Sequence, residues 1–271
     1  MLKGRHIDIM GIVNLTDDSF YAASRCMELG SVIRKVRTML DEGATIIDFG
    51  ASSSRPGSEP VGPEEEWSRL EPVLKEVKEM WPDLEISIDT SWSSVVAKAY
   101  DLIGNFIVND ISAGEDDPQM LPLVGRLGLK YIAMHKRGDS KTMQSLTCYE
   151  DVVDDVIAFF QEFSDRAGEN GVRDWILDPG FGFAKTVSQN YQMMRNLRKF
   201  RRPYSSCPRP KILVGVSRKS MIYKPLDITP EESLPQTQVL HLKALQEGAD
   251  MLRVHDVAEA KRTVEVYWRL C

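Results

Sequence analysis

Side chains that can bind polar ligands or hold protons stand at the ends of short apolar runs along this 271-residue chain. Asp48 and Asp89 lie just inside such runs, where a buried carboxylate is costly unless it is paired. Asp178 and the amides Asn14 and Asn109 end other runs. Because carboxylates accept hydrogen bonds and amides both accept and donate them, this set predicts a ligand rich in N–H donors, such as a fused nitrogen heterocycle.

Cationic side chains stand at several other run ends. Arg253 and His255 alternate around Val254, so their side chains share one face of a strand. Guanidinium and ammonium groups bind phosphate and carboxylate groups. We therefore expect an anion beside the heterocycle, bound by cations drawn from Arg55, Arg218, Lys219, Arg253 and, when protonated, His255.

The first run end also suits a divalent cation. Asn14, with Asp17 or Asp18 nearby, offers the oxygen ligands that Mg²⁺ prefers. Taken singly, each polar residue has a structural alternative, because Asp and Asn after a strand often form turns or cap helices. A role in a turn or a helix cap is favoured for Asp110 and Asp256. It does not explain well why polar residues stand at the end of every apolar run.

The apolar runs that must position these groups have the length of strands and are rich in Ile, Val and Leu. None alternates cleanly between apolar and polar residues, as expected for strands buried on both faces of a parallel sheet. The eight runs cover residues 7–15, 45–51, 85–89, 106–111, 130–135, 175–179, 211–217 and 250–255.

Amphipathic segments typical of helices separate the runs. In 64–81 apolar residues recur at helical spacing, and three glutamates occupy the first turn, where the helix dipole favours negative charge. Segment 231–248 ends at a glycine suited to a C-terminal cap. We expect the last helix to begin at Asp256, with Glu259 completing a capping-box-like pair.

Eight runs, each followed by a helical segment, predict an α/β fold of the (β/α)8 TIM-barrel type, with residues 1–271 forming a single domain. An open, doubly wound sheet is the alternative, but no G-x-G-x-x-G turn follows the first run. In a barrel the carboxyl ends of all strands meet at one face, where barrel enzymes carry their chemistry. Polar residues at every strand end therefore fit a large polar ligand in the mouth.

Composition excludes several classes of protein. The net charge is −6, from 34 basic and 40 acidic residues, and 42% of residues are apolar, which excludes a disordered or collagen-like chain. The acidic balance argues against non-specific nucleic-acid binding. No stretch approaches the roughly 18 apolar residues of a membrane span, and no signal peptide is evident. The four separated cysteines make no zinc motif, so we expect a cytoplasmic protein with reduced thiols.

Two segments approximate catalytic motifs without meeting their requirements. Residues 180–186 end like a phosphate-binding loop, but the glycine before Lys185 is missing. The serines at 52–54 are not framed by the G-x-S-x-G of a nucleophile elbow. We expect residues 178–180 to form a sharp turn from a strand end into a loop.

The run ends resemble, in order and nearly from end to end, the signature segments of the dihydropteroate synthases of folate biosynthesis. No one segment is decisive, but eight in order are specific. They are MGIVNLT (10–16) with DSF (18–20), IIDFG (46–50) with SSRPG (53–57), SIDT (87–90), VNDIS (108–112), MH (134–135), LDPGFGF (177–183), GVSRKS (215–220) and RVHDV (253–257).

The resemblance implies a transferase that condenses 6-hydroxymethyl-7,8-dihydropterin diphosphate with 4-aminobenzoate, giving 7,8-dihydropteroate and diphosphate. The implied mechanism is dissociative: diphosphate leaves with help from Mg²⁺, and the amine attacks the resulting carbocation. No covalent nucleophile is needed. The implied partners are these small molecules and a second copy of the chain, in a homodimer formed through outer helices, with no role for nucleic acid or membrane.

The resemblance also implies residue roles. The pterin would be held by Asp48, Asp89, Asn109, Asp178 and Lys219, and the diphosphate by Asn14, Ser54, Arg253 and His255, with Mg²⁺ on Asn14. The aminobenzoate pocket would be formed by Phe20, Arg55, Pro56, Phe183, Ser217 and Ser220. The catalytic groups would be Asp89, Lys219, Arg253 and His255.

The first loop departs from the family pattern. Residues 21–25 read YAASR where Ser-Asp-Gly-Gly is usual, and Asp17 stands where proline is usual. Two other functions stay open, and the altered loop bears on only one of them. A pterin-binding methyltransfer domain would share the barrel but does not need the anion-binding groups at 217–220 and 253–255. A catalytically lapsed paralogue would be supported only by the altered first loop.

Overall fold

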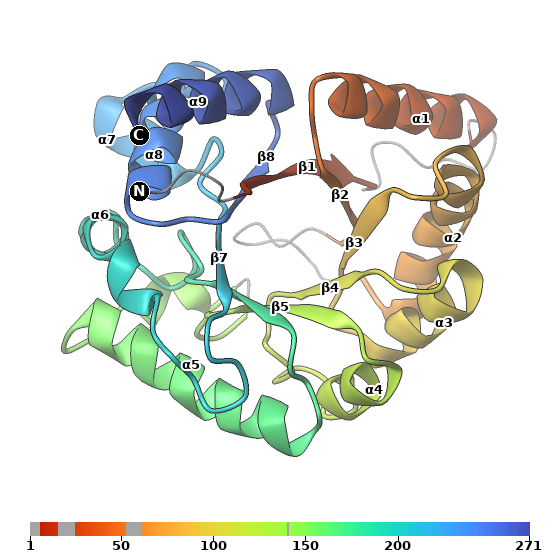
Figure 1. The fold of residues 1–271 in the computed structure, drawn as a ribbon, viewed down its shortest axis with the longest axis horizontal. Coiled ribbons are helices and arrows are strands. Elements are labelled where there is room, and N and C mark those ends of the chain that lie inside the picture. Colours follow the sequence, from red (N-terminus) through yellow and green to blue (C-terminus); the bar gives the residue numbers. More distant parts are fainter. Residues whose placement is uncertain (1–5, 16–24, 53–60, 140) are drawn as a thin grey trace.

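The chain forms a closed barrel of eight parallel strands in the computed structural model, which describes residues 6–15, 25–52, 61–139 and 141–271 (Figure 1). Each strand pairs with the next, and β8 closes the barrel against β1. The (β/α)8 prediction is confirmed, and the eight apolar runs differ from the strands by at most three residues at either end. The strands are β1 (Asp8–Asn14), β2 (Ile46–Gly50), β3 (Glu85–Asp89), β4 (Ile107–Asp110), β5 (Lys130–Met134), β6 (Trp175–Asp178), β7 (Lys211–Val214) and β8 (Met251–Val254).

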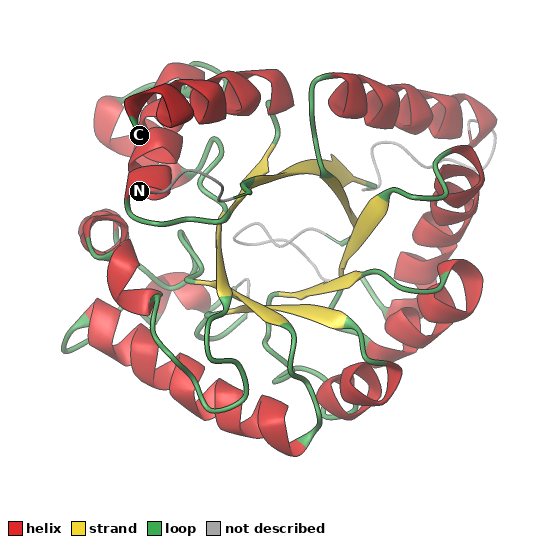
Figure 2. Ribbon diagram, viewed as in Figure 1, coloured by secondary structure: helices red, strands yellow, loops and turns green. Residues whose placement is uncertain are grey.

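Helices surround the barrel and cover its outer face (Figure 2). They are α1 (Arg25–Asp41), α2 (Pro63–Met80), α3 (Ser93–Ile103), α4 (Met120–Leu127), α5 (Val152–Glu169), α6 (Val187–Arg195), α7 (Ser220–Leu226), α8 (Leu234–Gln246) and α9 (Val257–Leu270), with short 3₁₀ turns η2 (Met143–Ser145) and η3 (Leu197–Phe200). None of these described helices has the length and apolar character needed to cross a membrane.

One predicted helix cap is wrong, and another was missed. Asp256 is the N-cap residue of α9, but its side chain makes no capping hydrogen bond because it pairs with Arg218 instead. The capping box lies at the start of α6, where Thr186 and Gln189 each bond to the other's backbone N–H. That box fixes where the loop after β6 ends.

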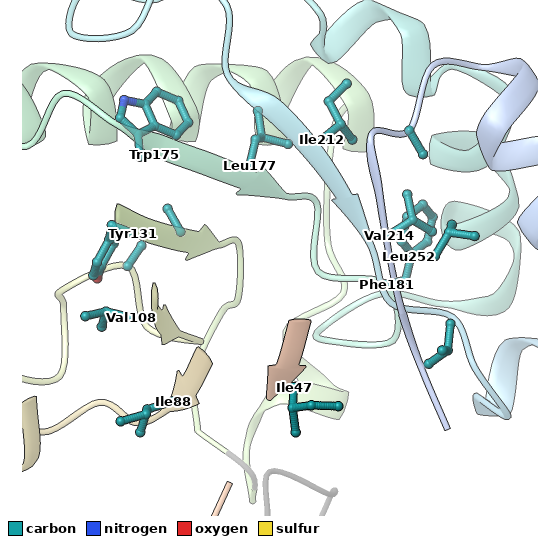
Figure 3. Close-up of a cluster of buried hydrophobic side chains, with 14 of the residues drawn as sticks. Ile47, Ile88, Val108, Tyr131, Trp175, Leu177, Phe181, Ile212, Val214 and Leu252 are labelled. Atoms are coloured by element: carbon teal, nitrogen blue, oxygen red, sulfur yellow. The ribbon is translucent and has the colours of Figure 1, made fainter. Parts of the chain in front are cut away.

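Two layers of apolar side chains hold the barrel together. The outer layer lies between strands and helices, and Figure 3 shows Phe181 within the same buried cluster as Val214 and Leu252. An inner layer inside the barrel is contributed by every strand except β3 and consists of Met10, Ile46, Ile107, Ile132, Ile176, Leu213 and Met251. The interior is therefore a packed core beneath any site in the mouth.

The inner layer also sets which polar residues face the mouth. Side chains alternate along a strand, so the residue two positions after an inner-layer residue points inward as well. On β2, β4, β6 and β8 those residues are Asp48, Asn109, Asp178 and Arg253. Asp110, one position beyond Asn109, faces outward instead. This alternation brings polar groups from separate strands together.

Candidate active site

Arg253 joins two strands across the barrel mouth. Its Nε donates to Oδ2 of Asp48 at 2.7 Å, and its Nη2 donates to Oδ2 of Asp89 at 2.7 Å. Asp48 has no exposed surface, and the Asp89 side chain is 16% exposed. Burying a carboxylate costs free energy because water is removed from the charge, and pairing with a cation offsets that cost. The two hydrogen bonds from Arg253 therefore explain why both aspartates can be buried here. The arginine is thereby held in a fixed orientation.

Asp48 is also bonded on its other side. The hydroxyl of Ser87 donates to Oδ1 at 2.6 Å, and Nδ2 of Asn109 lies 3.3 and 3.2 Å from the two carboxylate oxygens. With Arg253 in place, this buried carboxylate is fully engaged within the protein. Asp48 therefore orients Asn109 and Arg253, and the pterin contact that the resemblance implies for it stays a prediction. Ser87 was missed, although it alternates with Asp89 on β3.

The pKa of Asp89 is raised by burial and lowered by its pairing with Arg253. Burial raises its pKa to about 7, with Arg253 opposing the shift and the nearby carboxylates of Asp48, Asp110 and Asp178 adding to it. Those mutual effects show that β2, β3, β6 and β8 contribute to one electrostatic cluster. A carboxyl group in this range can accept from a ligand N–H or donate to a ligand nitrogen.

Asp178 ends β6, and Lys219 follows β7, the strand that pairs with β8. Asp178 accepts from the backbone N–H of Gly180 at 2.8 Å, and burial raises its pKa against the attraction of Lys219. Lys219 donates from Nζ to the carbonyl of Phe181 at 2.5 Å, and the same nitrogen lies 4.9 Å from the Phe183 ring centroid. Burial lowers the pKa of Lys219 to about 8 although Asp178 opposes the shift.

His255 is held by Ser217. Its Nδ1 lies 3.1 Å from the Ser217 hydroxyl oxygen, which also accepts from the His255 backbone N–H at 3.3 Å. Burial, together with the positive charge of Arg253, lowers the pKa of His255 to about 4. The imidazole is therefore neutral near pH 7 and can act as a hydrogen-bonding group, so the condition under which the sequence counted it as a cation is not met at that pH.

Arg218, expected among the cations of the mouth, is paired with Asp256. Its Nε and Nη2 bind the two oxygens of Asp256 at 2.9 and 2.5 Å. The backbone of Arg218 takes a positive φ of 53°, and the side chain is directed to the start of α9. Its charge is therefore shared with Asp256, although it still contributes to lowering the pKa of His255.

The remaining predicted residues divide into two groups. Asn14 is exposed at the carboxyl end of β1, and Ser220 is the first residue of α7. Phe20, Ser54, Arg55 and Pro56, together with Asp17 and Asp18, lie outside the described residues.

The part of the chain that the structure describes contains no group of three or more His, Cys, Asp or Glu that could hold a metal ion. Among the described residues, the donor offered at the end of β1 is the amide oxygen of Asn14. It fits Mg²⁺ that retains water ligands and binds mainly to substrate phosphates, as this ion usually does.

Asp110 has the structural role that was favoured for it. Its carboxylate accepts from the N–H and hydroxyl of Ser112, from the N–H of Gly114 and from the hydroxyl of Tyr131, at 2.6–2.9 Å. It therefore fixes the turn after β4 and anchors Tyr131 on β5.

Glu66 is a buried carboxyl group in the first turn of α2, one of the three glutamates that the sequence places there. It is 1% exposed, and no partner for its Oε1 is found among the described residues. Burial raises its pKa to about 7; the charge of Asp89 adds to this, while the Thr90 hydroxyl and Arg69 oppose it. An amphipathic pattern could not have revealed this, because its exposed neighbours Glu64 and Glu65 have the same residue type.

Glu66 predicts a pH dependence of stability. Since its pKa is higher in the folded than in the unfolded chain, the free energy of unfolding falls as pH rises from about 4.5 through 7. Replacing Glu66 by Gln should remove this loss, so the variant gains stability relative to the parent between pH 4.5 and 8 by on the order of 3 kcal/mol. Denaturant unfolding at several pH values measures it. The exposed control Glu71→Gln should show no such trend, and a pH-independent effect of Glu66→Gln would refute the assignment.

The comparisons with known proteins agree with this geometry. A family described as pterin binding enzyme matches residues 10–255. The dihydropteroate synthase of Haemophilus influenzae is 39% identical over 96% of this chain and 92% of its own length.

Two solved structures extend the comparison. A dihydropteroate synthase from Clostridium difficile, solved in the presence of pteroic acid, has a TM-score of 0.88 and 33% identity, and covers 100% of this chain and 99% of its own. That of Xanthomonas albilineans, solved with 4-aminobenzoic acid, has a TM-score of 0.86 and 31% identity, covering 98% and 93%. On its sequence, its barrel and its strand-end residues, this chain belongs to the dihydropteroate synthase family of pterin-binding enzymes.

Proposed function

We propose that the barrel mouth catalyses the condensation of 6-hydroxymethyl-7,8-dihydropterin diphosphate with 4-aminobenzoate to give 7,8-dihydropteroate and diphosphate, with the whole chain acting as one pterin-binding domain. The observation that carries the proposal is the bonded cluster of Arg253, Asp48, Asp89 and Asn109, which faces the mouth beside Asp178 and Lys219. It combines groups for an N–H-rich ring with cations for an anion.

The pterin ring suits the inward-facing polar residues. Asp89, Asn109 and Asp178 offer carboxylates and an amide to the ring's amino and N–H groups, and Lys219 can donate to a ring acceptor. Asp48 contributes by holding Asn109 and Arg253 in place. Negative charge on the carboxylates, Asp89 in particular, would favour the cationic pterin that forms as diphosphate departs.

The diphosphate suits the β8 side of the mouth. Arg253 commits Nε and Nη2 to two carboxylates, and among the described residues its Nη1 makes no bond, so that group remains to bind phosphate oxygens. His255, neutral near pH 7, would donate a hydrogen bond. Mg²⁺ held by Asn14 and the diphosphate would neutralise charge that develops on the leaving group. Ser54 would complete this subsite.

The aminobenzoate would lie against the loops after β6 and β7. Phe183, near Lys219, offers a ring face, while Ser217 and Ser220 offer hydroxyl groups. Phe20, Arg55 and Pro56 would complete the pocket, and the arginine would bind the carboxylate. No residue here needs to form a covalent bond to the substrate, because the amine itself attacks the carbocation.

The proposal is tested by following diphosphate release from the purified protein. Release should require both substrates and Mg²⁺, and it should stop when a chelator is added. Methyltetrahydrofolate serves as a comparison ligand in calorimetry and should bind more weakly than the pterin diphosphate. Tighter binding of methyltetrahydrofolate, with no diphosphate release, would favour a methyltransfer domain and contradict the proposal.

We further propose a homodimer formed through the outer helices. Leu226, Val239, Val266 and Leu270 are large apolar residues that are 50–66% exposed, and they lie on α7, α8 and α9. Exposed apolar groups on neighbouring helices are typical of self-association surfaces. Sedimentation velocity should show a dimer that Val239→Lys converts to a monomer.

We also propose a cytoplasmic location, supported by the free thiols of Cys148, Cys207 and Cys271.

A further inference from the structure

Lys185 is a buried lysine in the loop between β6 and α6, and it has no part in the mechanism above. Only 4% of its surface is exposed. Its Nζ lies 3.0 Å from the carbonyl oxygen of Gly180, 2.9 Å from that of Phe183 and 2.8 Å from Nδ1 of His135. One side chain thus joins two points of its own loop to the end of β5. Such a buried polar side chain is retained at a cost and therefore calls for an explanation.

The loop that Lys185 joins has an unusual backbone. Gly180, Gly182 and Ala184 take positive φ angles of 70°, 87° and 51°. A Cβ atom on Gly180 would meet the carbonyl oxygen of His135 at 1.9 Å, so the loop passes very close to the end of β5. A left-handed conformation is unfavourable for alanine. Bonds made elsewhere must therefore hold this shape, and those of Lys185 lie inside it.

The same loop carries groups of the proposed site. The Gly180 N–H holds Asp178, the Phe181 carbonyl accepts from Lys219, and the Phe183 ring lies beside the Lys219 ammonium. On the outer side, Asn190 of α6 accepts from the Gly182 N–H and donates to the Lys185 carbonyl. The loop is therefore fixed from two sides, and its inner side depends on the Lys185 amine and His135.

We propose that Lys185, with His135 as its partner, is a positioning residue that sets Phe183 and Lys219 for the second substrate. The proposal rests on the proposed function, because it assigns the loop to the 4-aminobenzoate pocket. Lys185 acts through the Gly180 and Phe183 carbonyls and touches no substrate itself.

The contacts of Lys185 do not depend on its charge. Carbonyl oxygens only accept, so Nζ donates to both of them as an ammonium or as a neutral amine. The hydrogen bond between Lys185 Nζ and His135 Nδ1 can form with either charge state of the lysine. Nδ1 accepts a hydrogen bond from the ammonium, or donates one to the neutral amine when the other tautomer is present. Burial lowers the pKa of both groups well below their usual ranges. Because His135 is the side chain that binds the Lys185 amine, replacing His135 should raise the KM for 4-aminobenzoate as the loss of Lys185 does.

Lys185→Met tests the proposal, because it keeps the length of the side chain and removes the donor. The KM for 4-aminobenzoate should rise at least about tenfold, since a small displacement of positioning groups weakens productive binding. A merely structural role would reduce the active fraction and leave KM unchanged. Thr186→Ala is the matched control: it breaks the capping box in the same segment and should leave KM unchanged.

His135 variants provide the second arm. His135→Asn retains a polar group near the position of Nδ1 and should keep KM close to that of the parent, whereas His135→Leu should raise it as Lys185→Met does. If Lys185→Met does not fold, this pair decides the question. If the parent makes no product, the Kd of 7,8-dihydropteroate replaces KM and should rise by the same factor in Lys185→Met and His135→Leu. Unchanged values in both variants would overturn the inference while leaving the proposed function intact.

Discussion

Replacing Arg253 by Ala is expected to abolish formation of dihydropteroate and to lower the stability of the protein. The guanidinium group is the cation closest to two carboxylates, Asp48 and Asp89, and it is proposed to bind the departing diphosphate. Without it, charge on the leaving group is no longer neutralised. Asp48, which has no exposed surface, also loses its charged partner. Removing one member of a buried ion pair typically costs about 3–5 kcal/mol.

A double variant separates these two effects of Arg253. In Asp48→Asn with Arg253→Met the buried carboxylate is neutral, so the free energy of unfolding should recover much of what Arg253→Met alone loses. Turnover should stay absent, because no cation has been restored. Denaturant unfolding and a dihydropteroate assay on the three proteins measure both quantities. Near-normal turnover in Arg253→Ala, or no recovery of stability in the double variant, would contradict the pairing described above.

Lys219→Ala is expected to reduce turnover by about 10²- to 10³-fold while the protein stays folded. Its Nζ donates to a backbone carbonyl and lies near an aromatic face. Buried Asp178 loses the attraction of Lys219 in this variant, but it keeps the hydrogen bond from the Gly180 N–H and the attraction of Arg253. Lys224→Ala, on the exposed side of α7 in the same segment, is the matched control and should leave turnover unchanged.

Lys219 also predicts the alkaline limb of the pH profile. Its pKa of about 8 means that the ammonium loses its proton as pH rises through that value. If the cation is required, kcat/KM for the pterin diphosphate should fall above pH 8, since that parameter reports groups of the free enzyme. Lys219→Arg keeps its charge to much higher pH and should move or remove this limb. A parent profile that stays flat from pH 7 to 10 would count against Lys219 as the required cation.

The sequence predicted the barrel because the physical signal was local and repeated. Each strand is a short run of apolar residues, and polar residues follow at its carboxyl end. Alternation along a strand then distinguishes Asn109, which faces inward, from Asp110, which faces outward. The same rule could have found Ser87, two positions before Asp89.

The hydrogen-bond partners within the site could not be predicted from the sequence, because they depend on strand register around the closed barrel. Arg253 and Asp48 are 205 residues apart in the chain, and only the closure of β8 against β1 brings them together. That pairing adds a positioning role for Asp48, which the residue type alone could not indicate. The pairing of Arg218 with Asp256 and the burial of Glu66 were also not predictable, because they depend on a positive φ and on helix packing that residue type does not encode.

Lys185 shows a different limit of the sequence. Its segment was tested only against a phosphate-binding motif and was set aside when the glycine spacing did not match. Its actual partners are backbone carbonyls and a histidine 50 residues away. No motif describes a lysine that bonds to its own loop.

Mass-spectrometric detection of 7,8-dihydropteroate in a reaction of the purified protein with both substrates and Mg²⁺ tests the central claim most directly. Product should accumulate with the parent protein and with Lys224→Ala, and should be absent with Arg253→Ala. A parent protein that binds the pterin diphosphate in calorimetry and yet forms no dihydropteroate would contradict the account, and would identify the chain as a member of the family that has lost its activity.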